Sequence, residues 1–303
     1  MNPTVSSTGR PLGAEVSGID LREPLSDEHL RLIEKWLAQY QILVFRGQKI
    51  TPEQQVQFTK KLGPLDPGIS LRPEGHLLPG YTDVLHVSNE PKSGTLVYGM
   101  RWHSDGLSYS RRPHGTTVLH CIKMPPGVGD TLYASQYVAY ELMSQKLQEL
   151  LRGLYWHVPE IIDCEMPSDR GYCQPLVKVH PITQRSFIYC AVHTASRIVG
   201  MTPQESAGLL QVIYDYQVHE SSIYRHQWQP DDVVIWENLA TMHVRADVVD
   251  YHKHGFRSIH RTATAGNVLA IECPADEFRP TRKGPARETD ELRWSDKPLV
   301  QTP

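Results

Sequence analysis

Apolar residues recur every three or four positions in several stretches that also carry helix-capping residues. Thr51–Gln54 and Thr202–Glu205 each combine a capping box with proline at the first helical position, so each is expected to begin a helix. Ser26 precedes another apolar stripe and is a suitable N-cap. The helices predicted in this way cover about 27–39, 51–62, 135–151 and a segment beginning at 202.

Most of the remaining chain alternates short apolar, β-branched runs with Gly, Pro, Asp and Asn. These runs predict strands at 42–45, 82–88, 115–123, 131–134, 186–193, 222–228, 232–236 and 256–264. Strands and helices do not alternate one for one, which disfavours a doubly wound parallel sheet. The pattern predicts a mainly β fold with flanking helices and a jelly-roll core. One domain is expected over 1–303, with 1–11 and about 277–303 as arms or surface coil.

Composition narrows the class of protein. The 31 Lys and Arg residues nearly balance the 34 Asp and Glu residues, so no nucleic-acid partner is expected. No apolar run approaches the roughly 20 residues of a membrane span, and no signal peptide is evident, so no membrane partner is expected. The five cysteines are scattered and form no C-x-x-C pair, which favours a cytoplasmic protein without a disulfide framework.

Common catalytic loops are missing. Gly127-Val128-Gly129 begins like a dinucleotide-binding loop, but the third glycine and the following helix are absent. The sequence also lacks the phosphate-binding loop, the G-x-S-x-G elbow and the H-E-x-x-H zinc motif. Nucleotide, α/β-hydrolase and zincin chemistry therefore lose their usual support.

His103 and Asp105 form the strongest candidate for a metal site. They stand two positions apart, so on extended backbone both side chains project to the same side and could reach one cation. Such a pair often arises by chance on a surface, and a third ligand must come from elsewhere. Among the fifteen histidines, His243 follows closely on a predicted strand and the Glu237-Asn238 turn.

Two arginines strengthen this interpretation. Arg257, Ile259 and Arg261 alternate along a predicted strand and share one face. They could be surface residues, but two guanidinium groups on an interior face would need anions. Arginine is well suited to bidentate binding of a carboxylate. Two histidines, one aspartate and inward arginines are typical of facial-triad iron(II) oxygenases.

Read in order, these motifs resemble the taurine / 2,4-dichlorophenoxyacetate dioxygenase family of iron(II)- and 2-oxoglutarate-dependent oxygenases. The resemblance covers nearly the whole chain, and the order and spacing of its pieces make it specific. The matching segments are 12–21, 43–48, 58–63, 102–105, 129–134, 236–243 and 259–262.

The resemblance implies roles for individual residues. His103, Asp105 and His243 correspond to the iron ligands, which makes them the catalytic and metal-binding residues. Thr131 and Arg257 correspond to the groups that hold the distal carboxylate of 2-oxoglutarate. Arg261 matches an arginine that binds the anionic group of the substrate in the taurine enzyme, although it could instead form a structural ion pair.

The implied cofactors are Fe(II) and the co-substrates 2-oxoglutarate and O2, with succinate and CO2 as products. A small, anionic organic substrate is expected, but the outcome remains open between hydroxylation, desaturation, cyclisation and bond cleavage. Gly99 replaces an asparagine of the taurine enzyme, so taurine itself is not predicted. A homo-oligomer is compatible with the family. Further substrate-binding candidates, each equally able to be core or surface residues, are Asn89, Tyr98, Trp102, Tyr109 and His193.

Two alternatives belong to other classes of protein. A zinc-dependent jelly-roll hydrolase or isomerase could use the same three ligands, but it would give Thr131 and Arg257 no role. A non-catalytic protein that binds 2-oxoglutarate would have no need for an open iron site. The oxygenase interpretation accounts for all five residues.

Overall fold

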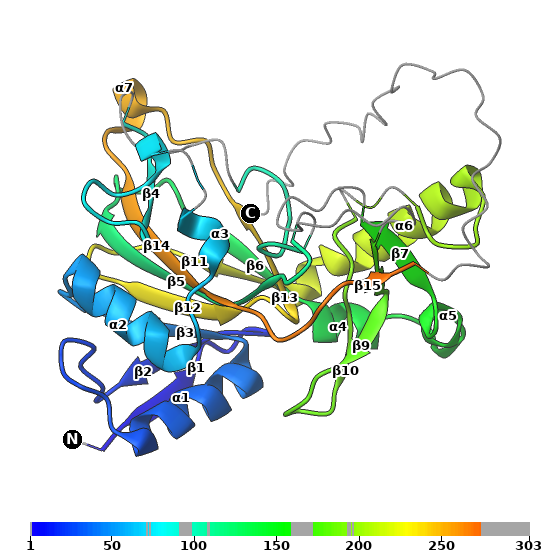
Figure 1. Cartoon of the computed structure of the whole chain (residues 1–303), viewed down its shortest axis with the longest axis horizontal. Helices are drawn as coiled ribbons and strands as arrows, with labels where there is room; N and C mark the ends of the chain where they lie inside the picture. The colour runs from blue at the N-terminus through cyan, green and yellow to red at the C-terminus, as the bar shows by residue number, and fades with distance from the viewer. Residues whose placement is uncertain are drawn as a thin grey trace.

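The computed structural model describes residues 2–70, 72, 74–90, 99–107, 110–158, 172–192, 195 and 197–273. Within these ranges the chain forms four β-sheets, of seven, three, three and two strands. The seven-stranded sheet and the three-stranded sheet that contains β6 pack face to face, with helices outside them (Figure 1). No helix in the described ranges is long and apolar enough to cross a membrane.

The larger sheet has seven strands, all antiparallel to their neighbours except for the parallel pair β2 and β3. Its central strands β12, β5 and β14 come from distant parts of the chain, so long-range pairing builds this sheet. In spatial order the strands are β1 (Thr4–Ser7), β2 (Ala14–Ser17), β3 (Ile42–Phe45), β12 (Val233–Glu237), β5 (His114–Lys123), β14 (Ser258–Ala265) and β4 (Leu85–Ser88).

The smaller facing sheet has three antiparallel strands. β6 (Thr131–Ser135) lies between β11 (Ile223–His226) and β13 (Thr241–Arg245). Its inner face meets the larger sheet in one apolar cluster, where Tyr133 packs with Trp236 and Ile259. The two sheets together form the predicted jelly-roll core.

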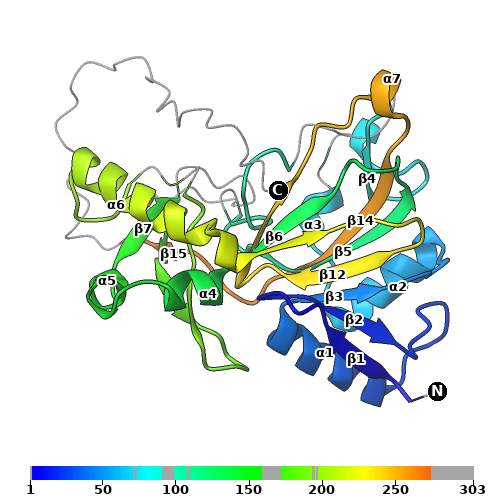
Figure 2. The same cartoon turned by 180° about the vertical axis from the view of Figure 1, so that it is seen from behind.

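Helices cover the outer face of the larger sheet. α1 (Asp27–Tyr40) and α2 (Pro52–Leu62) bury their apolar sides against it, as Figures 1 and 2 show. α1 lies against β3 and β12, whereas α2 lies against β5 and β14. The capping box predicted at Thr51 is confirmed. Short elements α3 (Pro67–Ser70) and η1 (Glu74–His76) follow, and α7 (Tyr251–His254) precedes β14.

A second group of elements lies at the other end of the molecule (Figure 2). The capping box predicted at Thr202 is confirmed and begins its longest helix, α6. The group comprises α4 (Gln136–Glu141), α5 (Gln145–Leu151), β7 (Tyr155–Val158), β8 (Tyr172–Pro175), β9 (Val177–Val179), β10 (Ser186–Ile188), α6 (Pro203–Gln217), η2 (Glu220–Ser222) and β15 (Ile271–Glu272).

Two expectations about local structure are wrong. The single helix predicted over 135–151 is two helices, because the Ser144 side chain accepts a hydrogen bond from the Leu147 amide and caps a new start. The predicted N-terminal coil contains strand β1, which pairs with β2 from Thr4↔Ser17 to Ser7↔Ala14. The predicted C-terminal coil, about 277–303, lies outside the described residues.

Candidate active site

His103, Asp105 and His243 converge between the two sheets. Their ligand atoms all lie within 4.8 Å of one another. The backbones of His103 and His243 form an isolated antiparallel bridge, with N–H···O distances of 3.0 and 2.8 Å. This bridge brings the rings to a centroid separation of 4.2 Å, so backbone pairing joins residues 140 positions apart.

Both imidazoles can offer a lone pair to a cation. Nδ1 of His103 lies 2.7 Å from the Arg101 carbonyl oxygen, which can only accept, so Nδ1 carries a hydrogen and Nε2 is the nitrogen that can bind a cation. Burial, together with nearby His103, lowers the pKa of His243 to about 3. His243 is therefore neutral near pH 7, as a metal ligand must be.

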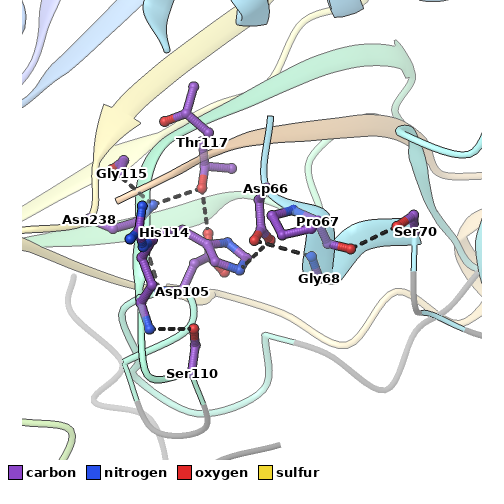
Figure 3. A network of polar contacts seen from close by, with 12 residues as sticks. Asp66, Pro67, Gly68, Ser70, Asp105, Ser110, His114, Gly115, Thr117 and Asn238 are labelled. Atoms are coloured by element: carbon purple, nitrogen blue, oxygen red, sulfur yellow. Dashed lines mark hydrogen bonds and ion pairs between the residues drawn. The ribbon is translucent and has the colours of Figure 1, made fainter. Parts of the chain in front are cut away.

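Asp105 is fixed by contacts to one of its two oxygens (Figure 3). Oδ2 accepts a hydrogen bond from the Thr117 hydroxyl at 2.7 Å and forms an ion pair with Nη2 of Arg261 at 3.1 Å. Oδ1 is left facing Nε2 of His103 and of His243, at 3.8 and 3.9 Å. Burial would raise the pKa of Asp105, but the Arg261 guanidinium holds it well below its usual range.

Asn238 continues this network outward (Figure 3). Its amide nitrogen donates to the Thr117 hydroxyl at 2.8 Å, and its amide oxygen accepts from the Asp105 backbone N–H at 3.2 Å. Nε1 of Trp236 donates to the same oxygen at 2.9 Å. The Trp-Glu-Asn segment near His243 therefore orients the carboxylate supplied by the His103 segment.

His114 and Asp66 support Arg261 from the other side. Nη2 of Arg261 donates to Nδ1 of His114 at 2.9 Å. This leaves Nε2–H of His114 to face Asp66 Oδ2 at 2.8 Å (Figure 3). A Cβ at Gly106 would lie 2.8 Å from the His114 ring and 2.9 Å from its backbone nitrogen, and φ there is +77°. The glycine after Asp105 thus allows the His114 segment to approach.

Arg257 is almost completely buried, at 2% exposure. Its Nε and Nη1 groups have no hydrogen-bond partner among the described residues. Burial, with repulsion from Arg245, lowers the pKa of Arg257 to about 10, so the group still carries its charge at neutral pH. A buried, charged donor with unused hydrogens is the arrangement expected of a binding group for an anion.

Thr131 lies on the inner face of β6, at 3% exposure. Nε1 of Trp228 donates to its hydroxyl oxygen at 2.9 Å. An indole N–H can only donate, so the hydroxyl hydrogen of Thr131 remains available for another acceptor. The preceding Gly129 would bring a Cβ to 3.5 Å from Nε of Arg257 and 2.7 Å from the Met124 sulfur, so the loop passes close to both side chains.

Among the other sequence-predicted site residues, two have structural contacts. Asn89 uses its amide nitrogen on the carbonyls of Val249 and Gly255 and its oxygen on the Arg257 backbone N–H. It therefore tethers the Arg257 loop, and a contact of Asn89 with substrate stays a prediction. Trp102 packs with Met242 on the face of β13 opposite to His243, and its contact with substrate also stays a prediction.

The candidates Tyr98, Tyr109 and His193 lie outside the described residues. Sequence reasoning also missed several participants. Arg245, two residues after His243 on β13, is buried and pairs in register with Thr131. The i, i+2 spacing from His243 was the available signal for Arg245, whereas no local pattern indicated Asp66 and His114.

The residues present fit Fe(II) and 2-oxoglutarate. The triad offers two imidazoles and an ionised carboxylate, which is the facial ligand set of this metal class. Arg257 and Thr131 offer unused donors for a carboxylate beside it.

Comparison with known proteins gives one consistent result. Residues 4–263 match the family described as "Taurine catabolism dioxygenase TauD, TfdA family". The chain is 29% identical over 252 residues to the alpha-ketoglutarate-dependent 2,4-dichlorophenoxyacetate dioxygenase of Cupriavidus pinatubonensis, covering 76% of this chain and 87% of the relative.

Solved structures agree with this result. A taurine dioxygenase from Burkholderia xenovorans superposes with a TM-score of 0.74 at 28% identity, covering 91% of this chain and 96% of the other. AAD-2 in complex with Mn(II) and N-oxalylglycine superposes with a TM-score of 0.73 at 25% identity, covering 89% and 100%. The chain belongs to the TauD/TfdA family of dioxygenases.

Proposed function

We propose that His103, Asp105 and His243 hold Fe(II), and that Thr131 and Arg257 bind the distal carboxylate of 2-oxoglutarate. The enzyme is an iron(II)- and 2-oxoglutarate-dependent dioxygenase. The convergence of the three ligand atoms beside the buried Arg257 is the observation that supports this assignment most strongly.

Each protein group has a defined task in the proposed mechanism. When bound, Fe(II) couples the reduction of O2 to the oxidation of 2-oxoglutarate to succinate and CO2 and to the oxidation of a substrate C–H bond. Thr117 and Arg261 keep Asp105 ionised and turn its Oδ1 toward the two histidines. Arg257 and Thr131 orient the oxoacid through its distal carboxylate, which sets the position of its reactive end.

We propose a small substrate bearing a carboxylate, sulfonate or phosphonate. The names of the two relatives above include a phenoxyacetate and taurine, which are both small and anionic. Arg261 supplies a positive charge beside the triad, with its side chain 12% exposed. Hydroxylation, desaturation, cyclisation and bond cleavage are all compatible with this site.

We propose a single oxygenase domain over 1–303, able to form a homo-oligomer, with no nucleic-acid or membrane partner. The cysteines within the described ranges are free thiols, which supports a reducing, cytoplasmic location.

An anaerobic titration tests the proposed function. Protein with Fe(II) and 2-oxoglutarate should develop a weak visible charge-transfer band, and admitting O2 with candidate anionic acids should release succinate. Absence of the band in folded protein would rule the oxygenase out. A band without succinate across a broad panel of anionic substrates would favour a 2-oxoglutarate-binding protein.

A further inference from the structure

The hydroxyl of Tyr133 is a buried polar group that the proposed function does not yet use. Tyr133 is 0% exposed, and its hydroxyl oxygen has no hydrogen-bond partner among the described residues. Buried tyrosine hydroxyls normally find a partner, because leaving one unsatisfied costs free energy. We therefore expect a bound ligand to supply the hydrogen-bond partner of this hydroxyl.

The register of the smaller sheet places Tyr133 between the two halves of the site. It pairs directly with His243 across β13, and their rings stack with centroids 6.0 Å apart. Thr131 lies two residues earlier on the same face of β6, about 7 Å along the strand. An oxoacid that reaches from the triad to Thr131 and Arg257 must pass along this face.

Electrostatics place the hydroxyl in the same region. Burial raises the pKa of Tyr133 well above its usual value, the charge of Asp105 raises it further, and the Arg257 guanidinium opposes the rise. Both charged groups are therefore within electrostatic range of the hydroxyl. The hydroxyl keeps its proton at neutral pH, so it can donate to an anion.

We propose that the Tyr133 hydroxyl donates a hydrogen bond to the distal carboxylate of bound 2-oxoglutarate, as a third group beside Thr131 and Arg257. This inference rests on the proposed function. A carboxylate accepts several hydrogen bonds, so the three donors do not compete. In the free protein the Tyr133 hydroxyl has no hydrogen-bond partner among the described residues, and the bound ligand supplies one.

This arrangement predicts opposite effects of Tyr133→Phe on stability and on binding. In the free protein, removing an unsatisfied hydroxyl should leave the thermal midpoint unchanged or raise it. Anaerobic titration of the Fe(II) protein with 2-oxoglutarate should show affinity weaker by roughly 10- to 100-fold, as for a hydrogen bond to a charged group. Isothermal titration of the Mn(II) protein with N-oxalylglycine should show the same loss without turnover.

Tyr137→Phe is the matched control. Tyr137 is also buried, but its hydroxyl accepts a hydrogen bond from Thr183, at 3.2 Å, in a different core cluster. That variant should lose stability and keep wild-type affinity for 2-oxoglutarate. A third titration with 2-oxobutyrate, which lacks the distal carboxylate, should not distinguish Tyr133→Phe from wild type.

Three outcomes would overturn the inference. The first is unchanged 2-oxoglutarate affinity in Tyr133→Phe. The second is a fall in thermal midpoint like that of Tyr137→Phe, which would mean that the hydroxyl has a partner in the free protein. The third is an equal loss of affinity for 2-oxobutyrate in Tyr133→Phe, which would mean that the hydroxyl contacts the metal-binding end of the oxoacid. Failure of wild-type protein to bind 2-oxoglutarate at all would instead reject the proposed function.

Discussion

Within the described ranges, two clusters that contain buried histidines lie on opposite faces of the larger sheet. The interior triad, His103, Asp105 and His243, lies between the sheets. The outer histidine cluster, His86, His120 and His260, forms a row across β4, β5 and β14. Thr262, two residues after His260 on β14, contacts Gln55 and Thr59 of α2, so His260 faces the helices.

Burial alone does not distinguish the clusters. Burial lowers the pKa of every histidine in the outer row, that of His260 to about 4, as it lowers the pKa of His243. Ring nitrogens without a hydrogen-bond partner among the described residues also occur in both. Neutral, desolvated imidazole is therefore insufficient evidence of a metal site.

The clusters differ in how their lone pairs are directed. In the outer cluster the rings pack edge to face, with centroids 5.9 and 6.3 Å apart for His86–His260 and His120–His260. In the interior triad a backbone bridge aligns two rings at 4.2 Å, and an ionised carboxylate completes the set. Convergence and an anion held by Arg261 mark the functional cluster.

The largest effect is expected from Asp105→Ala. Removing the only carboxylate of the interior triad should abolish Fe(II) binding and lower succinate formation by roughly three orders of magnitude or more, since the metal carries out the chemistry. Fe(II) binding by the variant, measured anaerobically, is the direct test. His260→Asn is the matched control in the outer cluster and should bind Fe(II) normally; retained activity in Asp105→Ala would reject the triad.

Arg257→Ala should have the next largest effect. Loss of a buried guanidinium should weaken the affinity for 2-oxoglutarate by roughly 100-fold, because the distal carboxylate loses a charge-assisted hydrogen bond. Titration of the Fe(II) protein without O2 measures the change. Arg46→Ala, which breaks ion pairs with Glu15 and Asp232 at a distant edge, should leave oxoacid affinity unaltered. Equal affinities in the two variants would place the oxoacid elsewhere.

Thr117→Val compares the two faces of the sheet directly. It removes the hydroxyl that holds Oδ2 of Asp105 and should weaken Fe(II) affinity by roughly 10-fold. Thr262→Val removes a buried hydroxyl on the outer face, in contact with Thr59, and should cost about 1 kcal/mol of stability without changing Fe(II) affinity. Metal affinity that fell equally in both variants would show a general loss of packing.

The smallest effect concerns stability at acid pH. The pKa of His260 is about 4 in the folded state, against about 6.5 in the unfolded chain, so the unfolded chain binds more protons between these values. The free energy of unfolding should therefore fall as pH drops from 6.5 to 4, although Asp231 and Glu90 partly oppose this for His120 and His86. Denaturant titrations across this range should show that the unfolding free energy of His260→Asn changes less steeply with pH than that of wild type. The difference in slope should correspond to at most about one proton taken up on unfolding.

Local patterns predicted the local structure well and missed elements that depend on partners. The capping boxes at Thr51 and Thr202 determine where α2 and α6 begin, since the side chains involved are three residues apart. Strand β1 has little apolar signal of its own and exists because β2 is beside it. The contacts of Asn89 with the Arg257 loop and of Trp102 with Met242 also depend on distant partners, and no local pattern indicated them.

The sequence alone determined the residue types of the site, their order and the family they indicate. Spacing on one strand could pair His103 with Asp105, and Arg257 with Arg261, because alternation along a strand is a local rule. Only the tertiary structure decided that His243 meets His103, that Thr117, Asn238 and Arg261 converge on Asp105, and that His260 faces the other way. These depend on pairing between strands far apart in the chain, and local side-chain preferences do not encode which distant strands pair.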